Sequence, residues 1–173
     1  MGVLLYYARA VNTKILVNLI KIGSQQATAT ENKNEAIAQP LYCVATYPNN
    51  GITYQSSNMI LDGHSDAAYL NVSKYFIQAG SHIFLSKDDP VPRLNGSILT
   101  ISQTIESVMS SATEAELASL FVTSKAMVQI RQTLIEMGWP QPKTPVQKDN
   151  SKSTGVTNKN IVKIQLKSME MRL

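Results

Sequence analysis

The sequence predicts an α/β fold in which a mixed sheet carries flanking helices and follows a helical hairpin. Three observations lead to this prediction. The first third is apolar and helical in period, three strand-like segments follow it, and then a long amphipathic helix precedes a short strand and further helical pattern. The order of three strands, helix, strand and helix is typical of a mixed sheet with helices packed on it. With 173 residues, 43% of them hydrophobic, the chain is long enough for one domain and an appendage.

The N-terminal third predicts two helices. Residues 3–20 are apolar nearly throughout and predict a mostly buried helix. Thr28 followed by Glu31 fits a capping box, which begins a second helix running toward residue 47. Pro40 falls inside this second helix and lacks the backbone N–H that a helix interior needs. We therefore expect a kink or a break at Pro40.

A turn signal separates this hairpin from the rest of the chain. Residues 47–51 read Tyr-Pro-Asn-Asn-Gly, a cluster of turn-forming residues. We accordingly divide the chain into a helical part, residues 1–55, and an α/β domain, residues 56–173. The domain begins with three segments that have the pattern of strands, at residues 58–70, 78–86 and 97–105.

A long helix is predicted from residue 112 to residue 137. Gly138 is a plausible C-terminal cap, and the prolines that follow it prevent the helix from continuing. Residues 144–148 predict a fourth strand, residues 151–158 a short helix or turn, and residues 161–173 a further helical segment. The apolar stripe of the long helix comprises Leu117, Leu120, Phe121, Met127, Val128, Leu134 and Ile135.

Charge and cysteine content narrow the setting. The net charge is +4, and the segment from Lys143 onward alone carries seven basic and two acidic residues. Such a segment suits a phosphate backbone, although the charge alone favours a solvated tail. Because Cys43 is the single cysteine, the chain has no internal disulfide, and we expect Cys43 to be a small core residue. No apolar run reaches the length of a membrane span and no signal peptide is evident, so we expect an intracellular protein, cytoplasmic or nuclear, without a membrane partner.

Three carboxylates in separate elements are the candidate site residues. Asp66 interrupts the first strand, where an acid is costly unless it lies at an edge or binds something. Asp62 competes with it, and spacing does not choose between the two. Glu114 and Glu116 lie near the start of the long helix, about 200° apart around its axis, so only one can face a given site.

The third candidate, Asp149, follows the fourth strand and precedes Asn150 and Ser151, so it also fits a helix cap or turn. Two Mg²⁺ ions held about 3.5–4 Å apart need several oxygen ligands from separate elements, which such a trio supplies. His64 and His82 are expected to be structural, because neither has a second His or Cys at ligand spacing.

The sequence around these acids resembles the ribonuclease H region of copia-type LTR retrotransposon polyproteins. The matching runs are His-Ser-Asp-Ala-Ala-Tyr-Leu at 64–70, Ser-Ser-Ala-Thr-Glu-Ala-Glu-Leu at 110–117 and Asp-Asn-Ser at 149–151, supported by residues 79–80 and 84–86. Residues 1–55 resemble, more weakly, the last helices of the reverse transcriptase that precedes that region.

The resemblance implies a ribonuclease H-like domain that hydrolyses the RNA strand of RNA–DNA hybrids by a two-metal mechanism. It implies Asp66, Glu116 and Asp149 as the catalytic, metal-binding acids and two Mg²⁺ ions as cofactors. In that mechanism one ion activates the attacking water and the other stabilises the leaving oxygen.

The chain also departs from the family pattern. The family continues through another strand and a helix that carries a fourth acid, whereas this chain stops at Leu173, and Glu170 does not match the fourth position. Lys148 replaces a small residue before the third acid. We therefore expect a C-terminally truncated domain that is weak or inactive, with association through the incomplete sheet. The alternative is a non-catalytic retroelement remnant that binds nucleic acid or a partner polypeptide.

Overall fold

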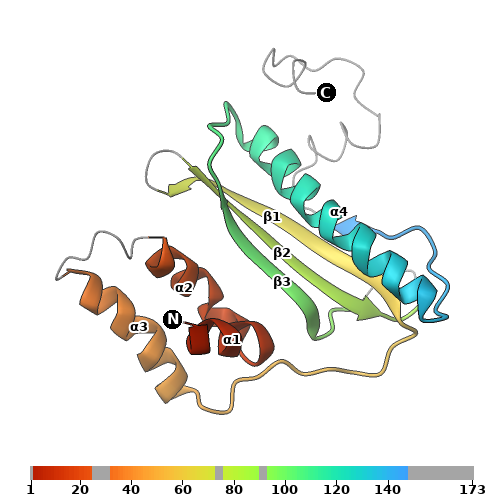
Figure 1. The fold of residues 1–173 in the computed structure, drawn as a ribbon, viewed down its shortest axis with the longest axis horizontal. Helices are drawn as coiled ribbons and strands as arrows, with labels where there is room; N and C mark the ends of the chain where they lie inside the picture. The colour runs from red at the N-terminus through yellow and green to blue at the C-terminus, as the bar shows by residue number, and fades with distance from the viewer. Residues whose placement is uncertain (1, 25–31, 73–75, 90–92, 148–173) are drawn as a thin grey trace. The chain divides into compact units, whose positions relative to one another are not determined.

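The computed structural model describes residues 2–24, 32–72, 76–89 and 93–147 (Figure 1). The chain forms two compact units, residues 1–55 and residues 56–173. This division falls at the turn-rich segment where the sequence analysis also divides the chain. The short helix or turn predicted at residues 151–158 and the helical segment predicted at residues 161–173 lie outside the described residues.

The first unit contains four helical segments: α1 Gly2–Ala10, the 3-10 turn η1 Thr13–Ile15, α2 Leu16–Gly23 and α3 Asn32–Thr46. The prediction of one helix over residues 3–20, and hence of a simple hairpin, is wrong. The helix stops at Ala10, and the side chain of Asn12 accepts a hydrogen bond from the backbone N–H of Lys14, which starts η1. Asparagine competes for backbone groups in this way and favours caps over helix interiors.

Helix α3 continues through Pro40, so the expected break at this residue does not occur. Proline costs a helix interior about 3 kcal/mol because it removes a hydrogen bond and crowds the preceding turn. Pro40 is itself buried, and the burial of its ring offsets part of that cost. The capping pair predicted for this helix, Thr28 and Glu31, lies outside the described residues.

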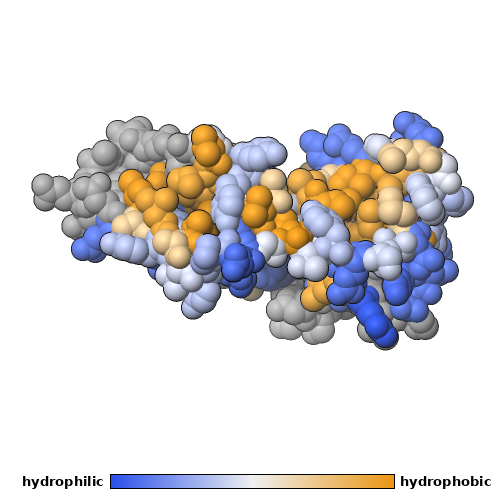
Figure 2. All heavy atoms as spheres, turned by 90° about the horizontal axis from the view of Figure 1, so that it is seen from below, coloured by the Kyte–Doolittle hydropathy of each residue, from blue (hydrophilic) through white to orange (hydrophobic). Residues whose placement is uncertain are grey.

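The core of the first unit is small. Four buried residues of α1, η1 and α2 form it, and partly buried Cys43 and Val44 of α3 pack against it, as expected for Cys43. The buried four are Ala8, Ile15, Leu16 and Leu19. Other apolar side chains of these helices, including Val3, Val17 and Leu41, are exposed, and apolar surface is plain in the space-filling view (Figure 2).

The second unit is built on a four-stranded mixed sheet with the order β3-β2-β1-β4 (Figure 1). β1 pairs antiparallel with β2, β2 pairs antiparallel with β3, and β4 runs parallel to β1 on its other side. The sequence predicted all four strands, and the β3 range matches at both ends. The bounds are β1 Ile60–Val72, β2 Phe76–Ser86, β3 Ser97–Ile105 and β4 Val146–Gln147.

Helix α4, Ala112–Glu136, connects the antiparallel strands to β4 and lies along one face of the sheet, against β1 and β2 (Figure 1). The hydroxyl of Ser111 caps its first turn by accepting a hydrogen bond from the N–H of Glu114. At the other end Gly138 has φ +87°, and the N–H groups of Gly138 and Trp139 bond to the carbonyls of Ile135 and Leu134. This is a Schellman cap, so the predicted role of Gly138 is confirmed.

The buried face of α4 differs from the predicted apolar stripe. Met127 and Leu134 are buried as expected, but Phe121 is 71% exposed and Val128 65% exposed, and Ile135 is also exposed. The residues that face the sheet are instead small or hydroxylated, namely Ala115, Ser119 and Thr123. Small side chains let the helix approach the strands closely, and this close approach decides which face is buried.

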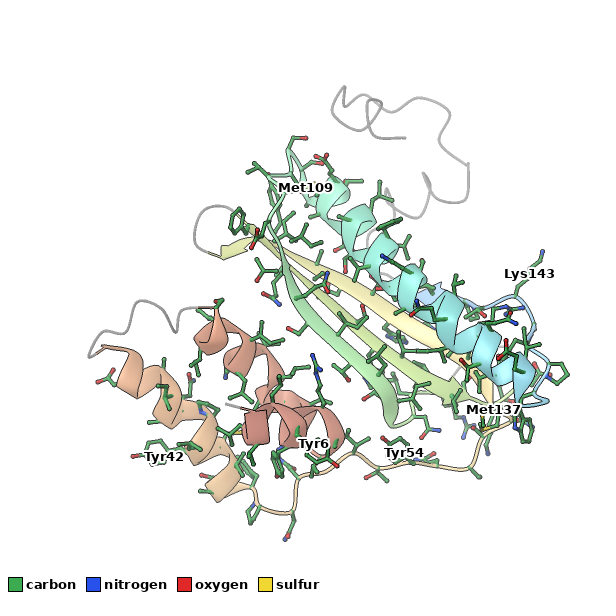
Figure 3. The ribbon with its side chains drawn as sticks, viewed as in Figure 1. Tyr6, Tyr42, Tyr54, Met109, Met137 and Lys143 are labelled. Atoms are coloured by element: carbon green, nitrogen blue, oxygen red, sulfur yellow. The ribbon has the colours of Figure 1, made fainter. Side chains whose placement is uncertain are left out.

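Two hydrophobic clusters fill the space between α4 and the sheet. One contains Leu61, Ile83, Met127 and Leu134, and the other contains Ile77, Met109 and Ala115. Met109 and Met137 mark the two ends of the helix in Figure 3. Among the described helices, none is both long and apolar enough to cross a membrane.

Candidate functional site

Strand β1 carries two aspartates on the same side of its pleat, and their environments differ. Ser65 is an odd-numbered residue of the same strand, and its side chain faces α4, because its hydroxyl donates a hydrogen bond to that of Ser119 at 3.2 Å. Asp62 and Asp66 therefore project from the opposite side of the strand. Asp66 is exposed, whereas Asp62 is fully buried.

Burial gives Asp62 a structural environment. One carboxylate oxygen accepts the backbone N–H of Gly63 at 2.7 Å, and its other oxygen, Oδ2, has no hydrogen-bond partner within the described part of the chain. Desolvation by burial raises the pKa of Asp62, and the Gly63 N–H and the nearby His64 partly oppose this rise. A carboxyl enclosed in this way is not open to a hydrated cation, whereas Asp66 is exposed. The environment thus favours Asp66 over Asp62, a choice that spacing left open.

The two glutamates of α4 are distinguished by the helix cap. One carboxylate oxygen of Glu114, Oε2, accepts hydrogen bonds from the backbone N–H and the hydroxyl of Ser110, at 2.8 and 2.9 Å. With the Ser111 cap, these bonds satisfy donors at the start of the helix, so Glu114 has a capping function. The sequence contains the signal, because Ser111 followed three residues later by Glu114 is a capping box. Glu116 is also buried, at 6% exposure.

The structure brings the segments around Asp66 and Glu116 together. The hydroxyl of Ser119 donates to the backbone carbonyl of Asp66 at 2.6 Å. Ser119 lies one turn after Glu116 on α4, on the same side of the helix. The segments that carry the two acids are therefore in direct contact through the backbone of Asp66, while its exposed carboxylate projects from the side of β1 that faces away from α4.

The third acid, Asp149, lies outside the described residues, which end at Gln147. The strand that leads to it is defined: in the parallel ladder with β1, Gly63 pairs with Val146 and His64 with Gln147. Among the described residues, which include Asp66 and Glu116, no three His, Cys, Asp or Glu side chains lie close enough to share a metal ion.

Both histidines have structural contacts. The rings of His64 and His82 pack against Phe84, with centroids 5.6 and 5.4 Å away. A ring nitrogen of His82 is 3.1 Å from the carbonyl oxygen of Asn95. The structural role expected of both histidines stays a prediction, and these are the contacts through which they would exert it.

Sequence reasoning missed a group of buried hydroxyls between α4 and the strands. Thr123 lies within hydrogen-bond distance of Ser81 at 2.6 Å and of Ser65 at 3.1 Å, and Ser65 bonds to Ser119. All four side chains are buried. The available signal was the spacing of Ser119 and Thr123, four residues apart and in line with Ala115 and Met127.

The segment between α4 and β4 is held by two side chains that the sequence analysis also missed. Arg131 of α4 donates to the carbonyls of Gln141 and Pro142 and to the hydroxyl of Thr144. Gln141 in turn accepts the N–H of Leu61 at 2.9 Å and donates to the carbonyl of Met59 at 2.8 Å. Prolines are frequent in this segment and supply no N–H, so side chains replace the missing backbone bonds. Lys143 extends outward from it (Figure 3).

Comparison with known proteins assigns the chain to no family. No family model, no curated protein and no solved structure matches the chain.

Proposed function

We propose that residues 56–173 form a ribonuclease H-like domain that hydrolyses the RNA strand of RNA–DNA hybrids. In this proposal Asp66, Glu116 and Asp149 are the catalytic acids and hold two Mg²⁺ ions. The proposal begins from the family resemblance of the three acidic motifs. Four features of the structure support it.

The register of the parallel ladder carries the proposal. His64 of β1 pairs with Gln147 of β4. Asp66 lies two residues beyond His64, and Asp149 lies two residues beyond Gln147. The offset from the paired residues is therefore the same for both aspartates, as a shared site beside β1 would require.

The topology also supports it. Three antiparallel strands are followed by a helix that returns the chain to pair a fourth strand parallel to the first, on the free side of β1. The same connection lays α4 against β1 and β2, where the hydroxyl of Ser119 reaches the backbone carbonyl of Asp66 in the middle of β1.

The chemistry of the donors fits Mg²⁺. The proposed ligands are carboxylates only, and Mg²⁺ prefers hard oxygen ligands, keeping part of its water shell. Glu114 is occupied by the helix cap and Asp62 is buried with a raised pKa, so the two competing acids have structural roles. Bound Mg²⁺ would supply an activated water and stabilise the charge that develops at the phosphate.

The predicted partner is a nucleic acid backbone. Lys143 is exposed at the end of the segment that leads into β4, and the sequence beyond it is basic. Basic side chains beside an acidic, metal-binding site suit a phosphate chain that passes over the site. The 2′-hydroxyls of an RNA strand would distinguish a hybrid from duplex DNA.

A cleavage assay tests the proposal. The purified chain is incubated with an RNA–DNA hybrid labelled on the RNA strand while Mg²⁺ is titrated. We expect weak, Mg²⁺-dependent cleavage that is lost in Asp66→Asn and Glu116→Gln. The matched controls are Asp88→Asn, an exposed loop aspartate, and Glu136→Gln, an exposed glutamate on the same helix, both of which should retain activity.

Two outcomes would contradict the proposal. Cleavage that survives Asp66→Asn would assign the activity to another site or to a contaminant. Binding of the hybrid, weakened by salt but without cleavage at any Mg²⁺ concentration, would support the alternative of a non-catalytic nucleic acid-binding remnant.

A further inference from the structure

We infer that Ser119 is a positioning residue that sets Glu116 in register with Asp66. The inference rests on the proposed function and assigns a role to a residue that none of the three acidic motifs includes as a ligand. It follows from the direction and burial of the hydroxyl bonds between α4 and β1.

The carbonyl of Asp66 fixes the direction of these bonds. A carbonyl only accepts, so the single hydroxyl proton of Ser119 goes to Asp66, over a distance of 2.6 Å. The Ser119 oxygen can then only accept, and it receives the proton of Ser65 at 3.2 Å. Thr123 has the oxygen of Ser65 and the carbonyl of Ser119 within reach as acceptors, at 3.1 and 2.9 Å. Ser81 then donates to Thr123.

The four hydroxyl side chains in this chain of bonds are buried, and those of Ser119 and Thr123 are fully enclosed. Water cannot replace a lost bond there, so the helix is held at one height along the strand. The bond from Ser119 to Asp66 is short and lies at the residue that carries the first acid. A slide of α4 by even part of a turn would break it.

Glu116 moves with Ser119 because both belong to the same turn of α4. The start of the helix is held independently, since the hydroxyl of Tyr69 near the end of β1 donates to the carbonyl of Met109 at 3.2 Å. The Glu114 cap fixes the first turn. Glu116 thus lies between two attachments of α4 to β1, and Ser119 is the one that contacts Asp66 itself.

The test compares Ser119→Ala with Leu134→Val in the full chain. Leu134 is buried at the far end of the same helix, so its variant destabilises α4 without touching the contact with Asp66. The readouts are Mn²⁺ binding by calorimetry, with no substrate present, and the Mg²⁺ concentration that gives half-maximal cleavage.

We expect Ser119→Ala to weaken Mn²⁺ binding and to raise the half-maximal Mg²⁺ concentration by about tenfold, the lower end of what loss of a supporting hydrogen bond costs a metal site. Leu134→Val should leave both within about twofold. Ser119→Cys keeps the size and weakens the donor, so it should shift both values in the same direction and serves if Ser119→Ala does not fold.

The inference fails if Ser119→Ala leaves both values unchanged, or if Leu134→Val shifts them as much. A wild-type chain that binds no Mn²⁺ and cleaves no hybrid would overturn the proposed function, and this inference with it. An active wild type with an unaffected Ser119→Ala would overturn only the positioning role.

Discussion

Replacing Gln141 with alanine should destabilise the second unit by about 2 kcal/mol, although Gln141 lies in a loop. Its side-chain amide acts as a peptide group of a strand, because it accepts the N–H of Leu61 and donates to the carbonyl of Met59. Met59 has φ +61°, a left-handed conformation that costs a side chain-bearing residue roughly 1–2 kcal/mol. The Gln141 bond helps to hold that conformation at the start of β1.

The magnitude follows from the groups left behind. Leu61 is fully buried, and a buried N–H without a partner costs about 1–3 kcal/mol. The lost bond to Met59 adds roughly 0.5–1.5 kcal/mol. Gln141 is only half-buried, so freeing its side chain returns about 1 kcal/mol of rotamer entropy, and the midpoints of these ranges leave a net loss of about 2 kcal/mol.

Urea unfolding measures this loss. The chain has a single tryptophan, Trp139, which lies two residues from Gln141 and reports on this segment by fluorescence. Far-UV circular dichroism shows whether the sheet unfolds in the same transition. With a urea slope of about 2 kcal/mol per molar, the midpoint should fall by roughly 1 M.

Two further variants sharpen the test. Gln132→Ala removes an exposed glutamine whose bond is to Glu136, so it should change stability by less than about 0.5 kcal/mol. Gln141→Glu keeps the acceptor for Leu61 but turns an oxygen toward the carbonyl of Met59, so it should be at least as costly as alanine. A midpoint for Gln141→Ala equal to that of wild type or Gln132→Ala would refute the reasoning.

Three other predictions concern the same unit. Burial raises the pKa of Asp62, so the stability that its protonated form contributes is greatest at low pH and is lost as the pH rises through that pKa. Asp62→Asn should remove this loss, and stability curves of variant and wild type that stay parallel from pH 4 to 8 would contradict the prediction. Gly63→Ala should cost about 1 kcal/mol, because the added Cβ would lie 2.9 Å from the sulfur of Met127. In a Met127→Ala background the same change should be neutral or stabilising, which a double-mutant cycle measured by urea unfolding tests. Thr123→Val should cost about 2 kcal/mol, more than Ser81→Ala, because it leaves the buried hydroxyl of Ser81 without an acceptor. Equal melting temperatures for the two variants would contradict the donor order.

The local sequence determined the positions of most elements of the second unit. The bounds of β3, the extent of α4 and the left-handed cap at Gly138 follow from side-chain alternation, helical period and the conformational freedom of glycine. These are properties of neighbouring residues, so the sequence carries them directly. The first unit shows the limit, because an apolar run predicted one helix where Asn12 ends it and η1 begins.

Only the tertiary structure decided which side of each element is buried and which acid has which role. Period placed Phe121 and Val128 on the core face of α4, but small Ser119 and Thr123 occupy it, because the closest approach of helix and strand depends on both surfaces. Asp62 and Asp66 share a strand and a side, and only the folded surroundings bury one and expose the other. Burial and hydrogen bonding depend on residues distant in sequence, such as Gln141, whose side chain accepts the N–H of Leu61. One amino-acid sequence does not show which distant residues pair.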